Sequence, residues 1–201
     1  MKALSRKMAI AAVLASVALV PAAFAQTPVQ QESWSITLPA GFGEFAKQQQ
    51  TVKSASGDIK QVTYVSKGTG GSAVIVTYGQ MTGKILDPTA TMNGGRDSLL
   101  KSLGAKLESE ATVEIDGKPG LSISYSAEKP RPIFARTDLV VAGPRMYQVI
   151  YLGGSAVALA SEATQQMFKS FDVNESAIEK AEQELATQDE AAPPAATTSN
   201  Q

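Results

Sequence analysis

The chain has 201 residues, of which 43% are hydrophobic and 18% charged, with a net charge of −1. This composition is typical of a globular protein with one domain. Neither cysteine nor histidine occurs, which excludes disulfides, Cys or Ser-His catalysis, and metal, haem or iron–sulfur sites built from these residues. We therefore expect no catalytic residue of these kinds, no bound metal and no cofactor.

The first 25 residues have the three parts of a secretory signal peptide. A start with three basic side chains is followed by an apolar run over 8–20, and Ala23 and Ala25 are the small residues that a signal peptidase needs. As a helix the run extends about 20 Å, too short for a hydrocarbon core of about 30 Å. We predict cleavage between Ala25 and Gln26, and a mature protein that is periplasmic or secreted and has no membrane anchor.

Removal of the three basic residues of the leader changes the net charge from −1 to −4. Segment 174–201 holds six acidic side chains and one lysine, a net charge of −5, so segment 26–173 carries +1. Neither segment has the basic face that binds nucleic acid or an anionic membrane surface. We expect neither as a partner.

The first predicted strand is 34–38, where Trp34, Ile36 and Leu38 alternate with polar residues. Segment 41–56 has no sustained apolar period and is predicted as a loop. Two more strands are expected at 59–65 and 73–78, joined by a glycine-rich turn. Asp87-Pro88 predicts the start of a helix whose best-formed part is 96–103.

Two hairpins are predicted next. Strands 111–115 and 121–125 flank a turn at 116–120, and Ser122, Ser124 and Ser126 make one face of the second strand hydroxyl-lined. The second hairpin joins 134–141 to 146–152, and a helix is expected at 155–169. The absence of βαβ alternation predicts an α+β fold, a mainly antiparallel sheet of about seven strands with helices packed on it.

Beyond residue 173 the sequence becomes acidic and then low in complexity. We predict a domain over 26–173 and a largely disordered tail over 174–201, with a possible short helix that begins at a capping box, Ser176 to Glu179. A solvated extension is the favoured interpretation of this tail, and a helix that docks a partner is the alternative.

Three stretches resemble the PsbP-like fold, the α/β/α sandwich also found in Mog-type Ran-binding proteins and bacterial DcrB-type envelope proteins. They are Trp34 to Phe42, Ile115 to Gly120, and Tyr147 to Val173 with its Phe168-Lys-Ser-Phe171 close. The resemblance covers 34–173 and rests on packing and turn residues. It implies the fold and a non-catalytic binding or assembly role, because members of this group act chiefly in that way. Many bacterial relatives are lipoproteins, and this chain lacks the required cysteine.

Two patterns with catalytic potential are weak. The S-x-x-K pairs at Ser98 and Ser126 occur about as often as chance predicts and lack the other elements of a serine acyl-enzyme site. Four carboxylates occupy even-numbered positions and are therefore expected on one face of a strand: Glu108, Glu110, Glu114 and Asp116. We interpret this face as solvated rather than as an acid–base or metal site.

The basic residues around the second hairpin are the best candidates for a binding surface. Arg131, Arg136 and Arg145, with Lys129 nearby, fall within 17 positions, and arginine binds carboxylate or phosphate groups in a bidentate manner. Scattered solubilising charge is the favoured interpretation of these residues, and a surface that binds an acidic partner or the protein's own acidic tail is the alternative. We expect a non-catalytic envelope protein that binds a protein partner or a small ligand through a loop-rich edge or the concave side of its sheet. A hydrolase without His or Cys, and a passive stabiliser of an envelope complex, are the alternatives.

Overall fold

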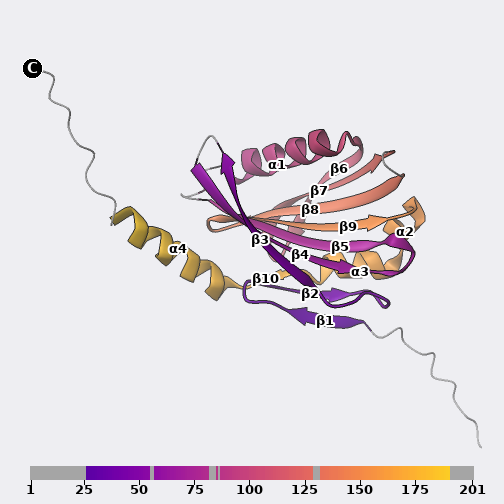
Figure 1. Cartoon of the computed structure of the whole chain (residues 1–201), viewed down its shortest axis with the longest axis horizontal. Helices are drawn as coiled ribbons and strands as arrows, with labels where there is room; N and C mark the ends of the chain where they lie inside the picture. Colours follow the sequence, from indigo (N-terminus) through magenta and orange to yellow (C-terminus); the bar gives the residue numbers. More distant parts are fainter. Residues whose placement is uncertain (1–25, 55–56, 82–84, 86, 129–131, 191–201) are drawn as a thin grey trace, which may run out of the picture.

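The computed structural model describes residues 26–54, 57–81, 85, 87–128 and 132–190. A large antiparallel sheet forms the middle of the molecule (Figure 1). Helix α1 (Pro88–Leu103) covers one face, and a small sheet with helix α3 (Glu162–Lys169) lies on the other face. The predicted α+β fold with a mainly antiparallel sheet is confirmed.

The large sheet has seven strands in the order β3-β4-β5-β9-β8-β7-β6, and all neighbours are antiparallel. Its strands are β3 (Ala46–Ser54), β4 (Gly57–Lys67), β5 (Ala73–Gln80), β6 (Lys106–Ile115), β7 (Lys118–Ala127), β8 (Ile133–Ala142) and β9 (Arg145–Gly153). A single turn of 3-10 helix, η1 (Thr69–Gly71), joins β4 to β5.

The small sheet has the order β1-β2-β10 and is also antiparallel. It contains β1 (Thr27–Gln30), β2 (Trp34–Leu38) and β10 (Asp172–Val173). The predicted strand at 34–38 therefore exists, but it belongs to this second sheet. Its apolar residues are buried against the large sheet and α3, and Trp34 makes edge-on contacts with Phe45 and Tyr64.

Helix α1 begins and ends as its sequence predicts. The Asp87 carboxylate accepts a hydrogen bond from Ala90 N at 2.9 Å, and Gly104 ends the helix in the left-handed conformation. The helix is regular through Gly94 and Gly95. A β-carbon at Gly95 would lie 3.0 Å from Met146 Cε, so this glycine allows α1 to approach the sheet closely.

Two predictions of local structure were wrong. Segment 41–56 contains β3, whose side chains are nearly all polar and exposed. This edge strand forms through backbone pairing with β4, which an apolar period does not reveal. The helix predicted at 155–169 is divided into α2 (Ala156–Ala160) and α3, because Ser161 is extended and caps α3 through Thr164 N.

Helix α4 (Glu175–Glu190) follows β10 directly and extends away from the sheets (Figure 1). Ala177, Ile178 and Ala181 are buried, so the packed core continues beyond residue 173. The helix is capped by Asn174, whose side-chain oxygen accepts hydrogen bonds from Ser176 N and Oγ. The predicted cap at Ser176 is thus two positions late. Residues 191–201 lie outside the described ranges.

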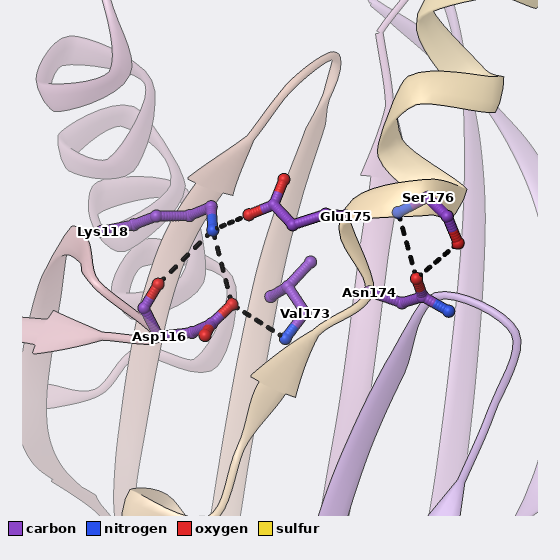
Figure 2. A network of polar contacts seen from close by, with 6 residues as sticks. All are labelled: Asp116, Lys118, Val173, Asn174, Glu175 and Ser176. Carbon is purple, nitrogen blue, oxygen red and sulfur yellow. Dashed lines mark hydrogen bonds and ion pairs between the residues drawn. The ribbon is translucent and has the colours of Figure 1, made fainter.

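A polar network at the hairpin turn between β6 and β7 holds the start of α4 (Figure 2). Lys118 Nζ pairs with Glu175 and contacts the Asp116 carboxylate at 3.4 Å. Asp116 in turn accepts a hydrogen bond from Val173 N at 3.3 Å. Hydrogen bonding and attraction to Glu175 raise the pKa of Lys118 above its usual value. The two hairpin residues therefore connect the large sheet to both β10 and α4.

Candidate functional site

A groove of about 720 Å³ lies at the β6–β7–β8 side of the large sheet, against α2 and α3. This volume is in the range of small-molecule sites. Its lining combines hydroxyl, guanidinium and amide groups with apolar side chains, and the residues are Glu108, Ser109, Ala111, Val113, Ser122, Ser124, Tyr125, Phe134, Arg136, Ala156, Leu159, Ala160 and Gln165.

The alternation along β7 separates the groove from the core. Leu121 and Ile123 are buried on the α1 side, where they pack with Met92 of α1, and Tyr125 belongs to the same cluster while also contributing to the groove lining. Successive side chains on a strand point to opposite faces, so Ser122 and Ser124 face the other side. The hydroxyl-lined face noted in the sequence is therefore the floor of the groove.

Arg136 is the central polar group of the groove. Its Nε and Nη2 donate to the two carboxylate oxygens of Asp138 at 2.9 and 2.8 Å, and its Nη1 donates to Gln165 Oε1 at 2.7 Å. The guanidinium carbon lies 4.2 Å from the centre of the Phe168 ring. Ser122 Oγ donates to Asp138 at 2.6 Å. These contacts hold Arg136 in one orientation, with 18% of its side chain exposed.

Helices α2 and α3 form the wall opposite β6. Ser155 caps α2 and Ser161 caps α3, which places the two short helices at an angle instead of in line. Gln165 is fixed at both ends of its amide, because its Nε2 donates to Leu159 O at 2.8 Å while its oxygen accepts from Arg136. Val157 of α2 does not line the groove and is 80% exposed.

The structure separates the arginines that the sequence grouped. Arg136 lies in the groove, and Arg131 lies outside the described residues. Arg145 starts β9 opposite Ala142, which is six positions from Arg136 along β8, a distance of about 20 Å. Arg145 donates to Gln80 Oε1 at 3.1 and 3.3 Å and lies over the ring of Tyr78. Burial raises the pKa of Tyr78, and the charge of Arg145 partly offsets this.

The expectation that four carboxylates share one strand face is wrong. A bulge between Leu107 and Ser109 changes the alternation along β6. Glu108 accepts a hydrogen bond from Ser126 on the groove side, whereas Glu110 pairs with Arg96 of α1 at 2.7 Å. Asp116 lies in the hairpin turn and not on a strand face. Within the described residues, no group of three or more acidic side chains is placed to hold a metal ion.

The arrangement is suited to binding. The groove offers hydrogen-bond donors flanked by apolar side chains, and burial of apolar surface would supply most of the affinity. Among the helices in the described ranges, none has both the length and the apolar character of a membrane span.

No family model matches the sequence, and no curated protein matches it. The solution structure of cyanobacterial PsbP (CyanoP) from Synechocystis sp. PCC 6803 aligns with 75% of this chain and 94% of its own, at 12% identity and a TM-score of 0.52. The fold is PsbP-like. A protein of unknown function from Pseudomonas aeruginosa, PA94, aligns with 86% of this chain and 99% of its own, at 10% identity and a TM-score of 0.32. The resemblance expected from the three sequence stretches is confirmed for the PsbP-like fold.

Sequence reasoning missed two residues that organise the groove. Asp138 stands two positions after Arg136, and this spacing on a strand puts both side chains on one face. The pairing was therefore detectable from the strand prediction. The role of Gln165 was not detectable in this way, because its contact with Arg136 spans 29 positions and depends on how α3 packs.

Proposed function

We propose that this protein is a non-catalytic binding protein of the cell envelope, and that its ligand or partner occupies the groove between β6, β7, β8 and the α2–α3 pair. The groove itself is the observation that carries this proposal, since it is open to solvent, amphipathic and built around an arginine held by three side chains. The resemblance to PsbP-like proteins supports a binding or assembly role. The leader-like first 25 residues support export to the periplasm.

Arg136 and the serine floor would supply the polar contacts of the site. A guanidinium carries five N–H donors in a fixed plane, and a serine hydroxyl can donate or accept. Because Asp138 and Gln165 fix the guanidinium, its donors are oriented before a ligand arrives, and less side-chain entropy is lost on binding. Arg145 would contribute to a separate surface, about 20 Å away along the hairpin.

Photo-crosslinking in living cells tests the proposal. The probe is placed at Ala160, which is exposed on the groove wall, and the control probe at Thr112, which is exposed on β6 and alternates with the groove-lining Ala111 and Val113. We expect one dominant adduct at Ala160 and none at Thr112. Equal labelling at both positions, or no adduct at Ala160, would show that the groove is not the functional surface.

Export has its own test. Mass measurement of the protein recovered from a periplasmic fraction should give a chain that begins at Gln26. A chain that retains Ala25 and the preceding residues, found with the cytoplasmic proteins, would contradict the envelope location.

A further inference from the structure

The charged side chains that line the groove are neutralised by partners. Arg136 is paired in a bidentate manner with Asp138, whose side chain is 6% exposed. Glu108 accepts hydrogen bonds from Ser126 at 2.8 Å and from Lys106 at 3.3 Å. These bonds, with that from Ser126 the stronger influence, hold the pKa of Glu108 below its usual value. The two positive and two negative groups leave the groove without net charge.

Hydrogen-bond donors nevertheless remain for a ligand. Among the described residues, three of the five N–H groups of Arg136 are used by Asp138 and Gln165, which leaves two. Ser124 adds a hydroxyl to the floor. Donors in a groove without net charge favour a neutral acceptor, such as a carbonyl, ether or hydroxyl oxygen.

The rest of the lining is apolar. Along the strands Phe134 lies on one side of Arg136 and Val113 on the other, and Leu159 adds an apolar side chain from α2. Three alanines, Ala111, Ala156 and Ala160, leave room between the larger side chains. A flat ring or a short acyl chain fits such a lining, because each buried CH₂ contributes about 0.8 kcal/mol of transfer free energy.

We propose that the groove binds an uncharged amphipathic small molecule, with an apolar body against Phe134 and Leu159 and an acceptor atom at Arg136, and that it disfavours anions. This deepens the proposed function and rests on it. An anionic group would add a negative charge beside the carboxylates of Asp138 and Glu108. Desolvation of a charge without its own partner is unfavourable.

Two dyes with the same aromatic skeleton test the ligand class. N-phenyl-1-naphthylamine is neutral, and 8-anilinonaphthalene-1-sulfonate carries one added sulfonate. Fluorescence titration of the mature protein should show the neutral dye binding at least ten-fold more tightly. Ala111→Trp, which fills the groove from exposed β6, should abolish this binding, while Thr112→Trp on the same strand should leave it unchanged.

Charge substitutions give a second, independent readout. Asp138→Asn leaves Arg136 without its counter-charge, so the affinity for the sulfonate dye should rise at least ten-fold relative to the affinity for the neutral dye. Asp97→Asn, the same change at an exposed position on α1, should alter neither affinity. Glu108→Gln on the exposed edge strand removes one negative charge without disturbing the core. It should raise the affinity for the sulfonate dye about three-fold relative to that for the neutral dye.

Several outcomes would overturn the ligand class. They are equal affinity of the two dyes for the wild-type protein, no binding of the neutral dye, loss of binding in Thr112→Trp as well, or an unchanged dye ratio in Glu108→Gln. A crosslink at Ala160 together with equal dye affinities would leave the binding function in place and refute only the preference for uncharged ligands. Binding of the neutral dye without a crosslink in cells would refute the proposed function instead.

Discussion

Gly143 controls how α4 packs against the sheet, and its replacement by alanine is the sharpest test of the fold. The residue lies in the two-residue turn between β8 and β9 at φ +55°. A β-carbon there would overlap Ile178 Cγ2 and lie 3.0 Å from Glu182 Oε1, both on α4. Gly117, in the turn between β6 and β7, has a similar φ of +68° but no atom within 4 Å of such a β-carbon. The two glycines therefore form a matched pair.

The magnitudes follow from this geometry. Alanine in the left-handed region costs about 1–2 kcal/mol, which is the full expected cost of Gly117→Ala. Gly143→Ala carries the same backbone cost and also displaces Ile178, whose side chain is buried. Exposure of a large aliphatic side chain costs about 2 kcal/mol. Gly143→Ala should thus be less stable than Gly117→Ala by about 2 kcal/mol, or about 4–8 °C in Tm for a chain of this size.

Urea unfolding of the mature protein, followed by circular dichroism, measures both variants. Ile178→Ala in each background separates the contributions, because removal of the isoleucine side chain relieves the overlap only when residue 143 is alanine. The double variant Gly143→Ala/Ile178→Ala should lose less stability than the sum of the single variants. Equal losses for Gly143→Ala and Gly117→Ala, with additive double variants, would refute the packing of α4 on this turn.

Three further predictions concern the buried Trp34, the carboxyl group of Asp172 beside Asp116, and the two glycines of α1. Trp34→Ala should lower the free energy of unfolding by about 3–5 kcal/mol, since the fully buried ring leaves a large cavity, and a loss below 1 kcal/mol in urea unfolding would contradict this. Burial, then hydrogen bonding and repulsion from Asp116, raise the pKa of Asp172. This group therefore stabilises the fold below its unfolded pKa of about 3.9, and that contribution is lost as pH rises through the folded pKa. Asp172→Asn should raise Tm at pH 7 by a small amount, worth less than about 1 kcal/mol for so exposed a group, and hardly at all at pH 3. A Tm at pH 7 that is lower in Asp172→Asn than in the wild-type protein would refute this prediction. Gly94→Ala, in open space, should stabilise α1 by up to about 1 kcal/mol. Gly95→Ala should gain less stability, because the new β-carbon would lie against Met146. Thermal unfolding should therefore give a higher Tm for Gly94→Ala than for Gly95→Ala.

Local features of the sequence were sufficient for most elements. The apolar alternation of Trp34, Ile36 and Leu38 predicts β2, and Asp87 with Gly104 predicts both ends of α1. These signals are readable because each depends on residues within one turn or one strand. The serine alternation of β7 likewise predicts the hydroxyl face that becomes the groove floor.

The remaining features depend on contacts between distant segments. Strand β3 is polar and exists through its pairing with β4, and the bulge at Leu107 moves Glu108 to a different face from Glu110. Gln165 meets Arg136 only because α3 packs on the sheet.

The sequence alone therefore determined the class of fold, most of its strands and the apolar and polar faces of β7, since residue spacing decides these locally. Tertiary structure decided the groove, the pairing of its charges and the docking of α4. Packing brings those residues together over separations on which local spacing has no influence.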